Sequence, residues 1–542
     1  MNTVAANTES WAFVTSVSPL RVRVDGDSSS LSITPQTLVA EVELWDRVRV
    51  KQVSGGSTIV TGIKGRNLSR SLASPTRTEF PYPTGFGWHA DYDDVAPHFT
   101  RMPAGFTYGD AGITPAELFG QASTALSAPT DTFYVDVATG SDANDGLTSG
   151  NAFFSLLAAR NAVNAKPSTA KCKVYVKGGI YGLGAGFPGT GATGAGVDRD
   201  TAWVAYDGPV TTGSFFPNAS FSSFAVDGTY TLTYSRTAPG YTTTRVVDLV
   251  TGVELTKVET GWRCQSTPNS WAIDAGKLYI RRSDSIGPPT SKTTRVFLDL
   301  PVMYARTAVN LFLGSEDDSP WVLQGGMGPG AWSNGGTLQL DMLTPTGTNH
   351  TIVCDGVAFD YAGAAGSASN SVTVQRWEGL AAFFNCSGKA PAKDGLNVSN
   401  DSYSEARAAG SYILTVNCDF TDSGRGNNVS CNSQTAHALY VHWIDVAGVS
   451  TDGKGGTVRH VGSSQTWMIG ARVSNDRGDM FTLTGTTPPT AVRADGDAEI
   501  WLDKCLIDQP GGGYAIVATE SARIHLHESI VRGTQSGAID TY

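Results

Sequence analysis

The sequence predicts an all-β protein in which a small β-barrel precedes a long parallel β-helix, with a β-rich domain inserted near the start of that helix. The 62 Gly and 25 Pro among 542 residues punctuate the backbone often, which suits many short strands and turns. Apolar and polar residues alternate in several stretches, as they do in half-buried strands. Segments of the C-terminal half recur at spacings of 32 and 24 residues, and such repeats are typical of a solenoid.

Composition excludes several classes of partner. The formal net charge of −11 disfavours binding to nucleic acid or to anionic lipid, because both need an excess of Lys and Arg. Residues 1–20 lack a basic stretch followed by an apolar run, and no segment reaches the ~20 apolar residues of a membrane span. We therefore expect no nucleic-acid partner, no membrane insertion, and synthesis in the cytoplasm.

Cysteine spacing and short motifs give no sign of a metal or cofactor. The 7 Cys are widely spaced and form no CxxC pair, so neither a disulfide framework nor a zinc-ligand pattern is present. The sequence also contains no phosphate-binding loop, nucleophile elbow or HExxH helix. We expect free buried thiols, no metal site and no cofactor.

Residues 1–66 contain several short alternating runs, the clearest at 20–24 and 47–50. They predict a small barrel, because closure of the sheet removes exposed strand edges. The phrases at 14–27 and 46–50 resemble the N-terminal module of minor tail proteins from phages of actinobacteria. That resemblance implies an OB-like barrel that docks the chain to other tail or baseplate proteins.

Residues 67–131 lack sustained periodicity and form a predicted connector, with one helix expected between Thr114 and Ala125. Residues 132–199 contain a strand, a turn rich in Gly and Asp, an amphipathic segment and a second strand. This order resembles the start of right-handed parallel β-helix proteins of the pectate-lyase-like type. It implies that a capping helix closes the end of the solenoid, where core and strand edges would otherwise be exposed.

Residues 200–300 show denser, hairpin-like alternation and are predicted to form the inserted β-domain. Similar insertions occur in phage tail-spike β-helices. From residue 301 to residue 542 repeats dominate the sequence. We expect the coils of a right-handed β-helix there, each of which buries its apolar side chains against its neighbours.

Two repeats set the expected register of the coils. Cys354, Cys386 and Cys418 are spaced by 32 residues, so we predict that they stack in one inward column. Residues 499–508 match residues 523–532 at a spacing of 24, which predicts two adjacent coils.

Candidate chemistry concentrates between residues 393 and 479, where carboxylates, His and Trp are interleaved. Glycan cleavage needs two carboxylates, roughly 5–5.5 Å apart for retention or 6.5–9.5 Å for inversion. Neighbouring coils, separated by about 4.8 Å, can supply such pairs. The alignment of coils places Asp394 close to Arg425, with Asp422 a few residues earlier. The predicted catalytic residues are Asp394, Asp422, Arg425 and Glu405.

Sugar contacts are predicted in the same region, which resembles polysaccharide-engaging β-helices of phage and bacterial surface proteins. The chain departs from that pattern because Ala and Leu follow His437, where the family usually has Asp and Gly. The alternative is structural, since Asp and Asn at coil corners commonly cap turns through hydrogen bonds to the backbone. The predicted glycan-binding residues are His437, Trp443, Trp467, Asn427, Asn428 and Asp445.

Together these features predict a phage tail-spike or tail-fibre-like virion protein that attaches to a host cell-surface glycan. Its expected location is the virion tail, and the resemblance implies a homotrimer and an actinobacterial host. Two alternatives stay open, a glycan depolymerase of the hydrolase or lyase type on the same β-helix and a purely structural tail component. Paired carboxylates beside exposed Trp would favour the depolymerase, whereas carboxylates bonded to their own turns would favour the other two functions.

Overall fold

The computed structural model divides the chain into two compact units, Met1–Arg77 and Thr78–Tyr542. It describes backbone strands between residues 9 and 63 and at 99–101, 108–111 and 427–433. The rest of the description covers residues 83–87, 114–187, 196–216, 218–283, 288–305, 307–326, 335–342, 350–363, 369–399, 411–421, 441–446, 448–451, 456–475, 490–509 and 513–542. Strands dominate these residues, and the predicted all-β fold is confirmed.

The first unit contains one five-stranded sheet with the order β2-β1-β4-β5-β3. Neighbouring strands are antiparallel except β3 and β5, which are parallel. Among the described strands no pairing joins β2 to β3, so the closure that an OB-like barrel requires stays a prediction. The strands are β1 (Glu9–Val17), β2 (Leu20–Val24), β3 (Gln36–Thr37), β4 (Arg47–Gln52) and β5 (Thr58–Ile63).

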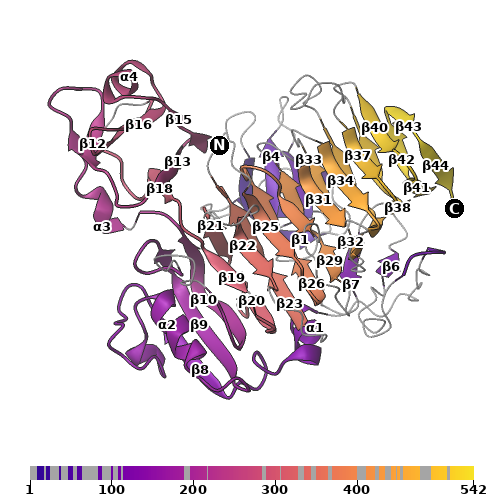
Figure 1. The fold of residues 1–542 in the computed structure, drawn as a ribbon, viewed down its shortest axis with the longest axis horizontal. Coiled ribbons are helices and arrows are strands. Elements are labelled where there is room, and N and C mark those ends of the chain that lie inside the picture. Colours follow the sequence, from indigo (N-terminus) through magenta and orange to yellow (C-terminus); the bar gives the residue numbers. More distant parts are fainter. Residues whose placement is uncertain are drawn as a thin grey trace. The chain divides into compact units, whose positions relative to one another are not determined.

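The second unit is a parallel β-helix whose coils run through three faces (Figure 1). Face 1 comprises β8 (Asp131–Val135), β9 (Lys171–Tyr181), β10 (Asp200–Gly213), β20 (Leu311–Ser315), β23 (His350–Asp355), β26 (Gly379–Phe384), β29 (Ser411–Val416), β32 (Val441–Val446), β35 (Gln465–Ile469), β38 (Glu499–Asp503), β41 (Arg523–His527) and β44 (Ala538–Thr541).

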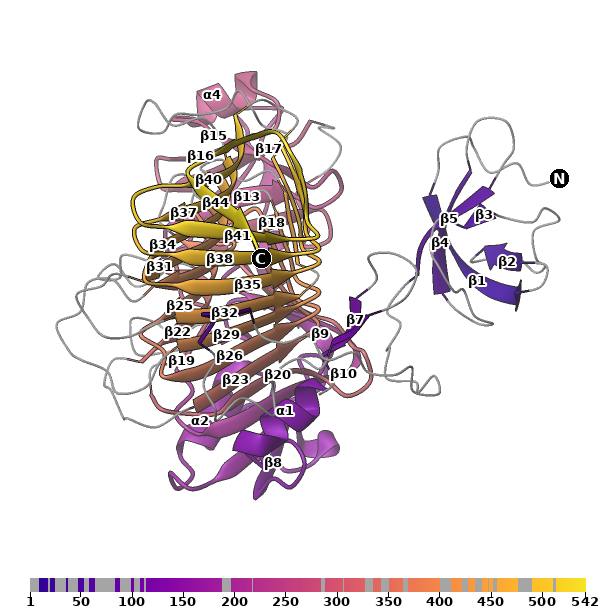
Figure 2. The ribbon, with the colours of Figure 1, turned by 90° about the vertical axis from the view of Figure 1, so that its right-hand side faces the viewer.

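Figure 2 shows the strands of face 1 stacked in order from β20 to β41. The strands of the other two faces also pair in parallel between coils, and those of face 2 are the shortest. Face 2 comprises β21 (Trp321–Gln324), β24 (Val357–Asp360), β27 (Ser387–Lys389), β30 (Asp419–Thr421), β33 (Val449–Thr451), β36 (Arg472–Ser474), β39 (Leu506–Asp508) and β42 (Ile530–Arg532). Face 3 comprises β19 (Met303–Ala305), β22 (Gly336–Asp341), β25 (Asn370–Gln375), β28 (Leu396–Ser399), β31 (Asn427–Ser433), β34 (Gly456–Gly462), β37 (Thr490–Asp495), β40 (Tyr514–Ala518) and β43 (Thr534–Ser536).

The start of the β-helix has the strand, turn and helix that its sequence predicts. After β8 and the short helix η2 (Ser149–Asn151), the helix α2 (Leu156–Asn164) begins at Ser155, whose side chain accepts a hydrogen bond from the backbone of Ala158. The turn requires glycine at Gly146, because its φ is 70° and a Cβ would lie 2.2 Å from the Phe153 ring. Leu156 of α2 is fully buried in the core of the solenoid.

The inserted domain begins later than the sequence pattern suggests. Residues 200–213 form the solenoid strand β10, which pairs in parallel with β9 and β20. The sequence pattern assigns them to the insertion, because the length and alternation of this strand resemble those of a hairpin arm. The insertion packs on itself around Trp271 and Val246, and the guanidinium of Arg245 donates to the carbonyl of Ala390 on the solenoid at 2.6 Å. Its elements are α3 (Asn218–Phe221), β11 (Ala225–Val226), β12 (Tyr234–Thr237), β13 (Thr243–Asp248), β14 (Val253–Glu254), β15 (Thr256–Lys257), α4 (Gly261–Ser266), β16 (Ser270–Asp274), β17 (Lys277–Arg281) and β18 (Thr294–Leu298).

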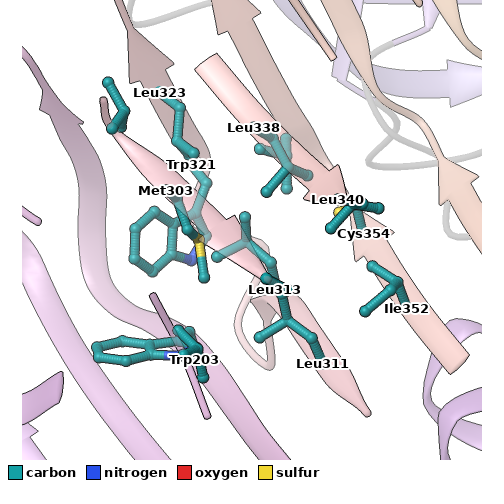
Figure 3. Packing of buried hydrophobic residues seen from close by; sticks show 14 of the residues in the cluster. Trp203, Met303, Leu311, Leu313, Trp321, Leu323, Leu338, Leu340, Ile352 and Cys354 are labelled. Atoms are coloured by element: carbon teal, nitrogen blue, oxygen red, sulfur yellow. The ribbon is translucent and has the colours of Figure 1, made fainter. Parts of the chain in front are cut away.

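The core of the β-helix is made of columns of inward side chains that stack in register from one coil to the next. Leu311, Ile352, Ala381 and Ile413 lie in register on successive strands of face 1, and all four are fully buried. Figure 3 shows the beginning of this core, where Trp203 packs among Leu, Met and Ile side chains. Burial of each Leu or Ile contributes about 1.5–3 kcal/mol, so the stacked coils stabilise one another.

The cysteine column contains two of the three predicted members. Ser387 pairs with Asp419, which places the preceding Cys386 and Cys418 in one inward column. Cys354 instead pairs with Phe383, because its coil is shorter than the next one, and the prediction that it shares the column is wrong. These thiols are free and buried, like every Cys whose side chain is described.

The corner between face 1 and face 2 depends on residues with left-handed backbone conformation. Asn385 and Asn417 have φ values of 53° and 54°, and Asn is one of the few residues that adopt this conformation readily. The side chain of Asn385 also donates to Asp355 at 3.2 Å. Six of the described coils turn at the same register position, which is occupied by Gly356, Asn385, Asn417, Gly470, Lys504 and Glu528.

The predicted connector covers the outer side of face 1. The helix α1 (Pro115–Ala122) begins with a capping box between Thr114 and Glu117, and its Phe119 packs 5.6 Å from Phe312. Farther along the stack, the ring of Phe86 contacts Trp467 and Trp501. We call residues 83–87 and 114–126 the strap, because they shield outward apolar side chains on coils far apart in the stack.

The remaining elements are the paired strands β6 (Phe99–Arg101) and β7 (Tyr108–Ala111). None of the described helices is both long enough and apolar enough to cross a membrane.

Phe119→Ala is expected to lower the free energy of unfolding by about 3–4 kcal/mol, the usual effect of truncating a buried Phe. Phe119 is 0% exposed and holds α1 on the solenoid. Denaturant titration measures the effect, and Gln121→Ala, on the exposed side of α1, is the matched control with an expected change within about 0.5 kcal/mol. Equal stability of the two variants would show that burial of Phe119 does not hold α1 on the solenoid.

Candidate functional site

Asp394, the first predicted catalytic residue, lies inside the molecule. It is 1% exposed, its Oδ2 accepts a hydrogen bond from Asn397 at 3.2 Å, and its backbone N–H donates to Asn370 at 3.1 Å. Leu396 pairs with Val429, so Asp394 aligns with Asn427 and not with Arg425 as the sequence alignment suggested. Asp394 therefore stabilises a coil corner and presents no oxygen to a polymer at the surface.

Several predicted residues have no described side chain. Asp422, Arg425, Glu405 and His437 lie outside the described residues. Asn427 and Asn428 lie in β31, which is described as backbone, and Asn427 pairs with Gly456. A catalytic or sugar-binding role for these six residues stays a prediction.

Trp443 and Trp467, the two predicted sugar platforms, are both buried. Trp443 is 2% exposed and points into the solenoid, where its Nε1 donates to Thr415 at 2.9 Å. Trp467 is 1% exposed and lies on the outer side of face 1 beneath Phe86 of the strap, with ring centroids 6.1 Å apart. Neither ring presents a face to a sugar, because the solenoid core covers one and the strap covers the other.

Asp445 also points inward. Its neighbours in the column are Thr415 and Met468, and the hydroxyl of Thr415 donates to Asp445 at 2.6 Å. The carboxylate fills the space above Gly448, where a Cβ would lie 2.4 Å from it. Burial raises the pKa of Asp445 to about 6, since the low-dielectric interior disfavours the charged form.

Asp445 and Trp443 line an internal cavity together with His460 and Thr466. The hydroxyl of Thr466 and Nδ1 of His460 are 2.9 Å apart, and burial lowers the pKa of His460 to about 3. The cavity offers about 10 Å³ to the centre of a water molecule, which is room for one water and not for a sugar ring. This cavity is a polar part of the core.

The strongest surface candidate lies on the last three strands of face 1. The parallel register aligns outward residues of β38 with those of β41, and these with β44 and the residue after it. Because side chains alternate along a strand, every second residue points out and three rows of three lie side by side. We call this set the outer grid, and it consists of Glu499, Trp501, Asp503, Arg523, His525, His527, Ala538, Asp540 and Tyr542.

Two imidazole–carboxylate pairs organise the outer grid. Nδ1 of His527 lies 3.0 Å from Asp503, and Nδ1 of His525 lies 2.6 Å from Asp540. The His525 ring also stacks on Trp501, with centroids 5.0 Å apart. Each carboxylate fixes its imidazole with Nδ1 as the hydrogen-bond donor, which leaves Nε2 as the reactive nitrogen.

The other members of the outer grid present an aromatic ring and a cation. Tyr542 is 44% exposed, and its ring lies 5.4 Å from that of His527. Burial of its hydroxyl raises the pKa of Tyr542, so the phenol stays protonated at neutral pH. Arg523 is exposed, and within the described part of the chain no ion pair or hydrogen bond engages its guanidinium. Such a surface can exchange hydrogen bonds with a polyol and cover one face of its ring.

The carboxylates of the outer grid are poorly arranged for glycoside cleavage. Asp503 and Asp540 lie two coils apart and two positions out of register, which corresponds to roughly 12 Å between their backbones. Cleavage by paired carboxylates uses separations of roughly 5–9.5 Å. Both groups are also bonded to imidazoles, so the arrangement supports binding more than cleavage.

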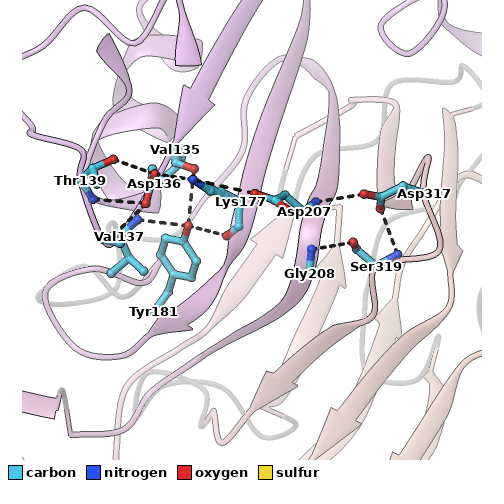
Figure 4. A network of polar contacts seen from close by, with 11 residues as sticks. Val135, Asp136, Val137, Thr139, Lys177, Tyr181, Asp207, Gly208, Asp317 and Ser319 are labelled. Carbon is cyan, nitrogen blue, oxygen red and sulfur yellow. Dashed lines mark hydrogen bonds and ion pairs between the residues drawn. The ribbon is translucent and has the colours of Figure 1, made fainter. Parts of the chain in front are cut away.

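Another charged cluster, at the start of the β-helix, is structural (Figure 4). Lys177 lies 3.2 Å from Asp136 and 3.9 Å from Asp207, and the backbone N–H of Asp207 donates to Asp317 at 2.9 Å. Although burial acts to raise it, hydrogen bonds from Ser319 and Asp207 hold the pKa of Asp317 at about 2. These carboxylates cap the turns of successive coils.

The sequence did contain a signal for the outer grid. The match between residues 499–508 and 523–532 is confirmed, because Glu499 pairs directly with Arg523. The strand Arg-Ile-His-Leu-His at 523–527 alternates polar and apolar residues, which places its polar side chains outward. The pairing of His525 with Asp540 is not visible in that repeat, since it depends on the register of a third coil.

Comparison with known proteins gives only distant likenesses. No family model and no curated protein matches the chain. The chain is similar to the solved structure of XylC with xylose at 12% identity, covering 76% of this chain and 70% of that one, with a TM-score of 0.39. It is similar to a lacto-N-biosidase from Eubacterium ramulus at 9% identity, with coverages of 76% and 68% and a TM-score of 0.30.

A phage protein is among the similar structures. The Gp54 tailspike of Acinetobacter baumannii bacteriophage AP22, solved in complex with capsular saccharide, is 10% identical over 71% of this chain and 69% of that one, with a TM-score of 0.23. At these TM-scores and identities the likenesses assign no activity to the chain.

Asp445→Asn is expected to raise stability at high pH relative to low pH. The buried carboxyl has a pKa of about 6, above the value of roughly 4 in an unfolded chain. Its contribution to stability is therefore full below about pH 4 and is lost as the pH rises through 6. Denaturant titrations at pH 4 and pH 8 measure the free energy of unfolding of both proteins. The value for the variant minus that for the natural chain should be roughly 1–2 kcal/mol larger at pH 8 than at pH 4. A difference that does not change with pH would contradict the raised pKa.

Proposed function

We propose that the chain is a phage tail-spike or tail-fibre-like protein that binds a host cell-surface glycan through the outer grid. The observation that carries this proposal is the set of outward side chains on β41 and β44, where Arg523, Tyr542 and the imidazoles of His525 and His527 lie side by side. Sugar recognition needs an aromatic face together with several donors and acceptors of hydrogen bonds.

The scaffold suits an extended polymer. Within face 1, β38 and β41 are fixed by paired strands on both sides, so their outward side chains are held on a rigid surface. Asp503 is 4% exposed and fixes the orientation of the His527 ring by a hydrogen bond, which reduces the conformational entropy lost on binding. Stacked strands repeat outward side chains at regular intervals, which favours binding along a chain.

Attachment to the virion is the second part of the proposal. The resemblance of residues 1–66 to tail-docking modules supports contact with other tail or baseplate proteins through the first unit. A location in the virion tail and an actinobacterial host are proposed on the same basis, and a homotrimer is proposed from the resemblance to the β-helix spikes of phages. The depolymerase alternative would need carboxylates other than Asp394, which is buried, and Asp503 and Asp540, which are widely spaced.

Tyr542→Ala and Arg523→Ala are each expected to weaken glycan binding roughly tenfold, the effect of losing about 1.4 kcal/mol of contact energy. The natural chain and the variants would be incubated with cell-surface polysaccharides isolated from actinobacteria. Retention of protein on intact cells measures binding, and size-exclusion chromatography of the polymer measures cleavage. Trp262→Ala is the matched control, because Trp262 is 57% exposed on the inserted domain, far from these strands in the sequence.

The outcomes separate the three functions. Binding that weakens in the grid variants, with polymer of unchanged length, supports an adhesin that contacts glycan at the outer grid. Shortened polymer would identify a depolymerase instead. Binding that weakens only in the Trp262 variant would move the contact to the inserted domain, and no binding to any polysaccharide would leave a structural tail component.

A further inference from the structure

His525 and His527 have the surroundings of metal-binding imidazoles. They occupy alternate positions on β41, so both point outward with backbones roughly 6.6 Å apart. Each bonds a carboxylate through Nδ1, at 2.6 Å to Asp540 and at 3.0 Å to Asp503. A metal-ligating His almost always donates a hydrogen bond from its other ring N–H to a carboxylate, a carbonyl or water, because this bond fixes the ring and raises its basicity.

A second observation is an unsatisfied nitrogen. Nε2 of His525 is buried and has no hydrogen-bond partner. Buried polar atoms without a partner are rare, and a missing ion or water is a common explanation. Nε2 is also the atom that a metal would take, since Nδ1 is engaged by Asp540.

Charge selects a cation over an anion at this position. The outer grid contains the carboxylates of Glu499, Asp503 and Asp540 against the single guanidinium of Arg523. With neutral imidazoles the set is therefore net negative, in a chain that is itself acidic. A divalent cation would be attracted, and imidazole nitrogen suits zinc, copper and nickel better than magnesium or calcium.

We infer that His525 and His527 bind one divalent transition-metal ion, with Zn²⁺ as the representative, through their Nε2 atoms. In the described residues no group of three or more His, Cys, Asp or Glu converges on one point, so water completes the coordination. Zinc–nitrogen bonds of about 2.0–2.1 Å require the two Nε2 atoms to approach one another. His527, whose side chain is 39% exposed, has room to turn. Tyr542 contacts both imidazoles and would move aside.

Isothermal titration of Zn²⁺ into the metal-free full-length chain at neutral pH tests this inference. The natural chain should bind one ion, and His525→Ala and His527→Ala should each lower its affinity at least tenfold. Asp503→Asn should lower it roughly 10–100-fold, because Asp503 is a positioning residue behind His527. Far-UV circular dichroism of each variant shows whether the β-helix is intact.

Two controls keep the result specific. Glu520→Gln removes a negative charge from an exposed turn outside the outer grid and should leave the affinity for Zn²⁺ unchanged. Tyr542→Ala should bind Zn²⁺ at least as well as the natural chain, although the same variant is expected to bind glycan more weakly. Absence of Zn²⁺ binding by the natural chain, or equal binding by folded variants of both His residues, would overturn the inference.

Discussion

The parallel register between successive coils is the constraint on which the rest of the structure depends. Six of the described coils leave face 1 at a residue with left-handed backbone conformation, such as Asn385 or Asn417, and this turn ends the alternation of inward and outward side chains along the strand. A slip by one residue would exchange the core and the surface of a whole strand. The fixed register therefore stacks Ile352 on Leu311 inside and, many coils later, His525 on Trp501 outside.

The outer side of face 1 changes in character along the stack. Near its start and middle the outward side chains are apolar and lie under the strap. The strap reaches Gln465, whose side chain accepts from the N–H of Gly87 at 2.9 Å and donates to the carbonyl of Gly85 at 3.0 Å. On the next coil Phe86 still covers Trp501, and after it the outward positions of β41 and β44 are charged or aromatic, as at His525 and Tyr542. The surface available to a partner on face 1 is thus set by where the strap ends.

The sequence predicted the features that depend on local pattern. The all-β fold, the capping helix and the spacing of the last coils were all visible as alternation or repeats. The errors came from contacts between coils of unequal length, which shifted the partners of Cys354 and Asp394. Burial was also misjudged, because a residue's position in the coil does not reveal the strap over Trp467 or the core around Trp443.

Environment, more than residue type, separates the polar core from the candidate site. Asp445 and Asp503 both lie on strands of face 1, where side chains point alternately inward and outward. Asp445 points inward and faces a water-sized cavity, whereas Asp503 points outward and supports the imidazole of His527. The inward carboxyl resists ionisation, since burial raises its pKa to about 6 and its partner Thr415 is an uncharged hydroxyl. The outward one has His527 as a partner that can carry positive charge. A row of carboxylates along a β-helix therefore becomes a binding surface only where register turns it outward and no other segment covers it.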